Sequence, residues 1–301
     1  MDLAMFPPRG GDPRIVREDT DFLVVSKPAG MHTAPAAPGT RDPAFPDLAS
    51  WVFERYPEIR EIRGRNRGEG GLLHRLDRET SGLVLFARTE EAFRALTAAA
   101  AEGLFRKDYI LRARPSRSGL PGSRPPRAAP EGVDPEAWVR FLDAAVDGTD
   151  DPVPGGPDSV ESLRALLAAD LDAGRRVFVA GRFRPFGPGA ARVACAPPAG
   201  AADGDPGRAR GAWGTEVYRT DIREARRSGP SLELRVSLAR GFRHQVRSHL
   251  AWIGLPLDGD VLYGGAEGDR LALHAASLEF PRPGTGVRIR VAEIAPGRGM
   301  E

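Results

Sequence analysis

The sequence predicts an α+β fold with a mixed, mainly antiparallel sheet and flanking helices. Short apolar or alternating segments, each long enough for one strand, recur from residue 14 to residue 291. Helical periodicity occurs in a few separate segments, and no segment repeats at a fixed period. The chain has 301 residues, 41% of them hydrophobic, which is enough for one large core or two modest ones.

The expected strands are bounded by turn-forming residues and polar segments. They cover residues 14–16, 22–26, 83–87, 105–112, 176–180, 215–222, 231–238, 271–280 and 286–291. Turns are expected at residues 27–30 and 81–82, where proline, glycine or serine interrupts the apolar pattern. On the strand at 105–112, Lys107, Tyr109 and Leu111 share one face because side chains alternate.

Helices are expected where apolar residues recur at spacings of three and four. They cover residues 46–55, 90–102, 136–146, 159–170 and 242–253. Thr89 is a suitable N-cap for the second of these helices, and Gly103 follows its end. Residues 61–71 are basic and rich in glycine, so they are expected to form a loop.

Composition excludes several classes of protein. Cys195 is the only cysteine, so neither an internal disulfide nor a cysteine metal cluster is possible. No apolar run approaches the roughly 20 residues that a membrane helix needs. The beginning of the sequence lacks the basic and apolar regions of a secretory signal. We therefore expect a cytoplasmic protein that does not associate with membranes.

Charge is distributed unevenly along the chain. Residues 130–172 carry eleven acidic and two basic side chains, a net charge of −9, while the whole chain has a formal charge of +2. The remainder therefore carries +11, which favours a polyanionic partner for the main body of the protein. We interpret residues 115–205, which are rich in proline, glycine, alanine and acid, as an insertion.

Residues 71–88, GLLHRLDRETSGLVLFAR, place a group of polar side chains directly before a buried strand. A loop attached to a rigid strand is a common position for catalytic groups. Asp77 lies between Arg75 and Arg78, and nearby cations favour an ionised carboxylate. A structural explanation is also open, since such an aspartate can cap a turn or pair with arginine. Tyr109 can likewise be a core tyrosine with a polar edge.

Familiar catalytic patterns are missing from the sequence. No glycine-rich phosphate loop follows a strand, and neither an HExxH zinc motif nor a GxSxG nucleophile elbow is present. His244 and His249 are five residues apart, which is the wrong spacing for two metal ligands on one helix face. One ionised aspartate, a strand tyrosine and an Arg/His-rich helix fit a carboxylate nucleophile or base that needs no cofactor.

The segment HRLDRETSG resembles the signature of the RluA-type RNA pseudouridine synthases, in which HRLD and two variable residues precede TSG. Similar segments follow the family's order elsewhere in the chain. They are FLVVSKPAG at 22–30, KDY at 107–109, HQVRSHLA at 244–251, PLDGDVLYG at 256–264 and LHAASLEF at 273–280. The resemblance covers about two thirds of the chain, and it implies a pseudouridine-synthase-like fold with a central catalytic cleft.

The resemblance implies a role for each matching residue. Asp77 corresponds to the nucleophilic aspartate, and Tyr109 to the tyrosine that stacks on the base and is placed to take the proton from its C5. Arg247 corresponds to the arginine that pairs with the aspartate, and Arg75 to the one that fills the gap left by the flipped base. The remaining expected substrate-binding residues are His74, Lys107, Arg243, His244 and Gln245.

One position departs from the family pattern. The family commonly has Gly-Arg-x-His before the helix, whereas this chain has Gly241-Phe242-Arg243-His244. We expect the chemistry to be unaffected, because Arg247 is present. A phosphate or structural contact is expected to be rearranged.

These observations predict a single catalytic domain over residues 1–301, with no separate N-terminal RNA-binding domain. The expected partner is ribosomal or transfer RNA, with no cofactor, no metal and a monomeric state. Two rivals are open: a catalytically inactive RNA-binding protein of the same fold, and a hydrolase that uses Asp77 with His74 as base. In the hydrolase, His74→Ala abolishes turnover while Tyr109→Phe is tolerated; the synthase predicts the reverse.

Overall fold

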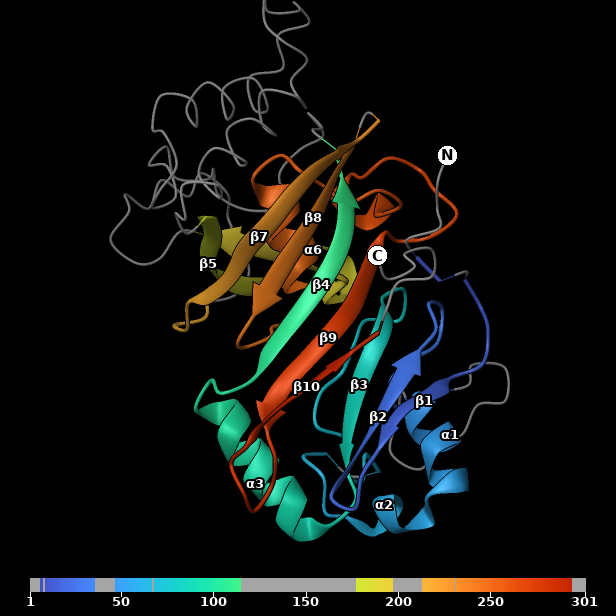
Figure 1. Ribbon diagram of the computed structural model, residues 1–301. Helices are drawn as coiled ribbons and strands as arrows, with labels where there is room; N and C mark the ends of the chain where they lie inside the picture. The colour runs from blue at the N-terminus through green and yellow to red at the C-terminus, as the bar shows by residue number, and fades with distance from the viewer. Residues whose placement is uncertain are drawn as a thin grey trace, which may run out of the picture. The chain divides into compact units, whose positions relative to one another are not determined.

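The computed structural model describes residues 6–7, 9–35, 47–66, 68–114, 177–196, 213–229 and 231–293 (Figure 1). The chain divides into two compact units. Unit 1 combines Met1–Tyr109 with Leu273–Glu301, and unit 2 is Ile110–Ala272. The predicted helices at 136–146 and 159–170, and much of the predicted insertion, lie outside the described residues.

Unit 1 contains a mixed sheet in which most neighbouring strands are antiparallel. Strand β3 is buried along its whole length, and it pairs antiparallel with β2 and parallel with β9. Strand β1 pairs with β2, and β10 with β9, both antiparallel. The bounds are β1 (Arg14–Glu18), β2 (Phe22–Lys27), β3 (Ser81–Ala87), β9 (Leu273–Pro281) and β10 (Arg288–Ala292). Together with the helices below, these pairings confirm the predicted α+β class.

The described helices of unit 1 are α1 (Leu48–Arg55), α2 (Pro57–Glu61) and α3 (Glu90–Ala101). The predicted N-cap of α3 is confirmed, because Thr89 Oγ1 accepts a hydrogen bond from the Ala92 amide at 3.1 Å. Its buried residues Phe93 and Leu96 join the core against β2, β3 and β9, and Figure 1 shows α3 beside the ends of β9 and β10. The short helix α2 was not predicted, because five residues are too few for a periodic pattern.

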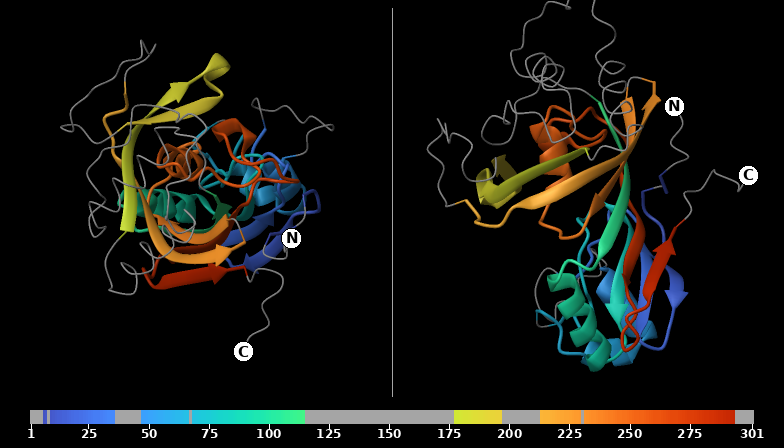
Figure 2. Two further views of the ribbon diagram at one scale, coloured as in Figure 1. Left: turned by 90° about the horizontal axis from the view of Figure 1, so that it is seen from above. Right: turned by 60° about the vertical axis from the view of Figure 1, so that its left-hand side comes forward.

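In the described part of unit 2, neighbouring strands follow the order β8, β7, β5 and β6, and each neighbouring pair is antiparallel. Helix α6 packs against β5, β6 and β7. Figure 2 shows the β5–β6 hairpin in yellow beside β7. The bounds are β5 (Val177–Phe186), β6 (Arg192–Ala196), β7 (Tyr218–Ser228), β8 (Ser231–Leu238), α6 (Gln245–Trp252) and the 3₁₀ turns η1 (Pro188–Ala190) and η2 (Val261–Tyr263). Strand β4 (Arg106–Ala113) includes Tyr109, where unit 1 gives way to unit 2.

Several local predictions were wrong. Strand β5 was predicted to end at residue 180 but continues to Phe186, and β6 was not predicted. The turn expected at residues 81–82 is part of β3. Helix α6 begins three residues later than expected, because His244 has left-handed dihedrals (φ 56°, ψ 19°) that a right-handed helix cannot contain. Strand β7 runs to Ser228 although its second half is highly charged, because pairing with β8 stabilises it.

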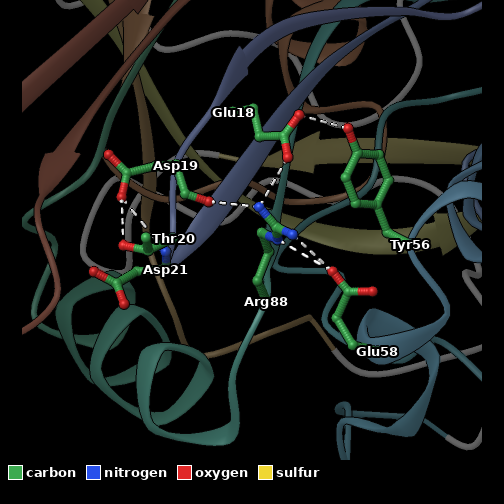
Figure 3. Close-up of polar contacts among 7 residues, drawn as sticks. All are labelled: Glu18, Asp19, Thr20, Asp21, Tyr56, Glu58 and Arg88. Carbon is green, nitrogen blue, oxygen red and sulfur yellow. Dashed lines mark hydrogen bonds and ion pairs between the residues drawn. The ribbon is translucent and has the colours of Figure 1, made fainter.

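Arg88, directly after β3, is the centre of a polar network in unit 1 (Figure 3). Its guanidinium donates to Glu18 Oε1 at 3.0 Å and to Glu58 Oε1 at 2.9 Å. It also donates to the carbonyl of Asp19 and lies over the ring of Tyr56, whose hydroxyl donates to Glu18. These bonds raise the pKa of Arg88 although burial opposes the shift. The network ties the end of β1 and the start of α2, with Asp19 and Tyr56 beside them, to the end of β3.

We expect Arg88→Met to lower the free energy of unfolding by about 1–2 kcal/mol, since several partly exposed ion pairs of modest strength are lost together. Arg63→Met is the matched control, because the exposed Arg63 side chain forms no ion pair among the described residues. Urea denaturation of both variants measures the difference. Equal stability of the two variants would show that the network contributes nothing.

Candidate active site

The loop that carries Asp77 is held in place by the turn after β2. Lys27 is fully buried, and its ammonium donates to the carbonyls of Pro28 at 3.0 Å, Met31 at 2.8 Å and Arg78 at 3.2 Å. Gly30 also exchanges hydrogen bonds with Arg78, whose carbonyl accepts from the Gly30 amide at 2.8 Å. A buried charge that satisfies backbone carbonyls on both segments fixes one against the other.

The middle of the loop has a second attachment. Thr33 Oγ1 donates to the Leu76 carbonyl at 2.7 Å and accepts from the Leu76 amide at 3.1 Å. The Thr80 amide donates to the Asp77 carbonyl at 3.1 Å, which closes a tight turn after Asp77. These bonds hold the backbone on both sides of Asp77 before any substrate is present.

The backbone at Gly82, where the Asp77 loop meets β3, accepts only glycine. Its φ is +119°, and a Cβ atom there would lie 2.3 Å from the carbonyl oxygen of Ala275 on β9. The parallel pairing of β3 with β9 requires this close approach. The second residue of β3 therefore has to be glycine.

The charge of Asp77 acts electrostatically on Tyr109. Asp77 is half-buried, and Tyr109 on β4 is only 8% exposed. Burial raises the pKa of the Tyr109 phenol, and the negative charge of Asp77 raises it further. The structure thus brings together the two residues of unit 1 that the sequence predicted to be catalytic.

His74 and Lys107 form a second pair between the same two segments. Burial lowers the pKa of Lys107 to about 8, and the charge of Arg65 contributes to the shift. Burial also lowers the pKa of His74 well below its usual value, with further contributions from Lys107 and Arg65. His74 is therefore neutral at physiological pH. Its Nε2 accepts from the Leu85 amide at 3.3 Å, and its Nδ1 has no hydrogen-bond partner in the chain as described.

Spacing accounts for both pairs. Lys107 and Tyr109 are two apart on β4 and so share the predicted face, while His74 and Asp77 are three apart in the loop. The loop and this face of β4 therefore carry a carboxylate, a phenol, an amine and a neutral imidazole. Such a set can position, charge-stabilise or attack a polar substrate.

Arg75 is an exposed residue of the same loop. It forms an ion pair with Glu69, and its side chain is 55% exposed while that of Glu69 is 6% exposed. The guanidinium is thus held at the surface of unit 1, next to the Asp77 loop. Its expected role in filling the gap left by the flipped base stays a prediction.

Arg247 lies on α6 in unit 2, where Asp260 binds it through two hydrogen bonds. Arg247 Nε donates to Asp260 Oδ2 and Nη2 donates to Oδ1, both at 2.8 Å. Arg247 is 6% and Asp260 2% exposed, so this is a buried bidentate pair. The guanidinium also lies 5.2 Å from the ring centroid of Tyr263. The expected pairing of Arg247 with Asp77 stays a prediction.

The other expected binding residues of unit 2 have bonds within the fold. His244 Nδ1 is 3.0 Å from the Tyr263 hydroxyl. Gln245 donates to the Arg219 carbonyl at 2.9 Å and accepts from the Phe242 amide. Arg243 donates to the carbonyls of Ala190 and Arg192. A role of these residues in binding substrate stays a prediction.

Sequence reasoning missed Lys27, Thr33 and Asp260. A lysine directly before Pro-Ala-Gly was visible as part of a turn, but its three backbone acceptors come from the folded chain. Asp260 lies in the segment at 256–264, where a carboxylate thirteen residues after Arg247 gives no local signal of pairing.

Among the described residues, no group of three or more His, Cys, Asp or Glu side chains is arranged to hold a metal ion. No helix in the described part of the chain is both long and apolar enough to cross a membrane. The expectations of no cofactor and no metal stay predictions.

The mixed sheet and its helices form a fold that solved structures of other proteins share. Similarity in fold agrees: human RNA pseudouridylate synthase domain containing 1 matches with a TM-score of 0.55 at 18% identity, covering 95% of this chain and 84% of that one. Human RNA pseudouridylate synthase domain containing 4 matches with a TM-score of 0.53 at 15% identity, covering 94% and 88%. The model of the RNA pseudouridylate synthase family matches residues 21–252, so the chain belongs to this family.

Curated relatives are similar in sequence. Ribosomal large subunit pseudouridine synthase D of Pseudomonas aeruginosa is 28% identical over 92% of this chain and 66% of its own length. Ribosomal large subunit pseudouridine synthase C of Escherichia coli K12 is 27% identical over 92% of this chain and 65% of its own. An uncharacterized RNA pseudouridine synthase of Chloroflexus aurantiacus is 30% identical over 87% and 59%. The chain thus spans about two thirds or less of the length of these relatives.

Proposed function

We propose that this protein converts specific uridines in structured RNA to pseudouridine. The observation that carries the proposal is the Asp77–Tyr109 pair, formed by residues that match the family's signature segments within a chain that belongs to the family. The names of the bacterial relatives favour ribosomal RNA of the large subunit as substrate, with transfer RNA as the second candidate.

The proposed reaction rearranges bonds without an oxidant or a reductant. The target nucleotide leaves the stack, and Arg75 takes the vacated position. Asp77 attacks the ribose or the base, and the bond between N1 and C1′ breaks. The uracil then rotates, C5 bonds to C1′ and the bond to the Asp77 carboxylate breaks. The proton on C5 is lost and N1 gains a proton. Mass is conserved, which distinguishes this reaction from hydrolysis.

The raised pKa of Tyr109 refines its proposed role. The phenol is protonated at neutral pH, because ionisation would place a second negative charge near Asp77 in a buried position. We infer that its ring stacks on the uracil, and that its hydroxyl can take the C5 proton only while it passes its own proton on. Tyr109→Phe therefore keeps the stacking surface and removes the proton path.

Arg247 is proposed to keep Asp77 charged and correctly placed. Asp260 occupies the Nε and Nη2 donors of this guanidinium. This pairing orients Arg247 on α6, so the proposal includes Asp260 as a positioning residue. Arg and carboxylate in bidentate contact have a defined geometry, which supports such a role.

The test compares RNA from cells with and without this protein. Pseudouridines are mapped by a carbodiimide adduct that stops reverse transcription, and cells are complemented with wild type or Asp77→Ala. Stops that vanish without the protein and return only with wild type support the proposal and identify the substrate. Identical maps, with RNA still bound by the purified protein, would instead indicate a binding protein without catalysis.

The lowered pKa of Lys107 predicts that the affinity for RNA depends on pH. With a pKa of about 8, the amine is charged at pH 7 and mostly neutral at pH 9. If the ammonium contacts the RNA, the dissociation constant rises by up to about tenfold over this interval. Fluorescence anisotropy with one labelled RNA at constant ionic strength measures the change.

Lys107→Arg is the matched control for this effect, because a guanidinium stays charged at both values of pH. We expect its pH dependence to be flatter than that of wild type. Identical curves for the two proteins would assign the pH effect to other groups.

A further inference from the structure

The β5–β6 hairpin of unit 2 is an arginine-rich segment without acid. Residues 177–196 contain three arginines and neither aspartate nor glutamate. Two other arginines of unit 2 differ, because Arg219 pairs with Asp221 and Arg240 with Glu216. The excess of positive charge at this hairpin is therefore local.

Arg184 is the most unusual of these residues. It is only 5% exposed, and its Nε atom is buried without a hydrogen-bond partner in the described structure. Its guanidinium carbon lies 4.3 Å from the ring centroid of Trp213. Stacking on an aromatic ring offsets part of the cost of burying this charge, but it leaves the in-plane N–H donors unused. An anion would complete the environment of Arg184.

A similar arrangement recurs at the other strand of the hairpin. Arg192 on β6 lies 4.9 Å from the ring centroid of Phe186 on β5. Neither Arg184 nor Arg192 has a carboxylate partner among the residues that the structure describes. Each guanidinium is thus held by a ring and has donors that no acidic side chain occupies.

Phe242 accounts for the rigid placement of the hairpin. Its ring stacks on Phe183 of β5 at 5.0 Å and 12°, and the neighbouring Arg243 donates to the carbonyls of Ala190 and Arg192. The position where the family commonly has arginine is therefore a packing residue here. It attaches the base of the hairpin to the segment before α6, and the arginines are carried on a fixed support.

We propose that Arg184 and Arg192, with Trp213 and Phe186, form a surface of unit 2 that binds the phosphate backbone of RNA. The choice of RNA as partner rests on the proposed function. The proposal adds a contact made by residues outside the predicted site. Planar guanidiniums match phosphate oxygens bidentately, and rings beside them offer stacking faces to unpaired bases. An acidic protein could pair with the guanidiniums but has no bases to stack on the rings. The combination of guanidiniums and aromatic rings therefore favours RNA as the partner.

Binding of a fluorescein-labelled RNA stem–loop to the full-length protein tests the proposal. The variants are Arg184→Gln/Arg192→Gln and Arg192→Gln alone, measured by anisotropy at several salt concentrations. The double variant is expected to bind at least about tenfold more weakly. The slope of log Kd against log salt concentration is expected to fall by roughly one to two, as for two lost phosphate contacts. The single variant leaves buried Arg184 intact and is expected to lose about half of that slope.

Arg223→Gln/Arg226→Gln is the matched control, since it removes the same charge from exposed positions of β7 in the same unit. We expect it to bind RNA within about threefold of wild type, because distributed surface charge is screened by salt. Poly-glutamate serves as a competitor that has charge without bases, and it is expected to displace the RNA poorly.

Three results would overturn the proposal. They are unchanged binding by Arg192→Gln and by the double variant, an equal loss in the control, or displacement of the RNA by poly-glutamate as effective as that by unlabelled RNA. Because binding is measured without turnover, a wild type that binds RNA through this surface but forms no pseudouridine would contradict only the proposed catalysis.

Discussion

Asp77→Asn is expected to abolish pseudouridine formation, lowering turnover by at least about 10³-fold, while the protein folds normally. The amide has nearly the same shape as the carboxylate, but it is not a nucleophile of comparable strength. The loop itself is held by Lys27 and Thr33, whose bonds go to the backbone and do not depend on the Asp77 side chain. A loss of turnover can therefore be assigned to chemistry.

The measurement is release of tritium from RNA labelled at C5 of uridine, under single-turnover conditions. Glu79→Gln is the matched control, since it removes a carboxylate from the same loop at a residue that pairs with Arg9. We expect the control to retain at least about a third of wild-type activity, as is usual for an exposed ion pair. Turnover by Asp77→Asn within tenfold of wild type would rule out Asp77 as the nucleophile.

Arg247→Met is expected to have the largest effect on stability, lowering the free energy of unfolding by about 3–5 kcal/mol. Asp260 is 2% exposed, so removal of its bidentate partner leaves an uncompensated buried carboxylate. Denaturation in urea, followed by circular dichroism, measures the loss. The same variant is expected to be inactive, but instability alone would explain that result.

The double variant Arg247→Met/Asp260→Asn separates the two causes. With both charges removed, we expect at least about 2 kcal/mol of the lost stability to return. If Arg247 acts on Asp77, activity stays absent in the refolded double variant. Recovery of activity together with stability would show that the pair is needed only for the fold of unit 2.

Elements with a strong local signal were predicted well from the sequence. The alternating residues of β8 and the apolar run of β3 predicted strands, and Thr89 marked the start of α3. In each case the relevant physical preference lies within a few neighbouring residues, as alternation, burial or capping. The resemblance also identified Asp77 and Tyr109, which the structure brings together in unit 1.

Sequence by itself therefore determined the class of fold and the family signature, and it predicted catalytic roles for Asp77 and Tyr109. Only the tertiary structure decided which groups contact the functional segments. Lys27 donates to the Arg78 carbonyl in the Asp77 loop, Asp260 pairs with Arg247, and Trp213 stacks on Arg184. Such contacts join segments that are distant in sequence or different in pattern. They depend on which faces meet after burial, and local propensity carries no information about that.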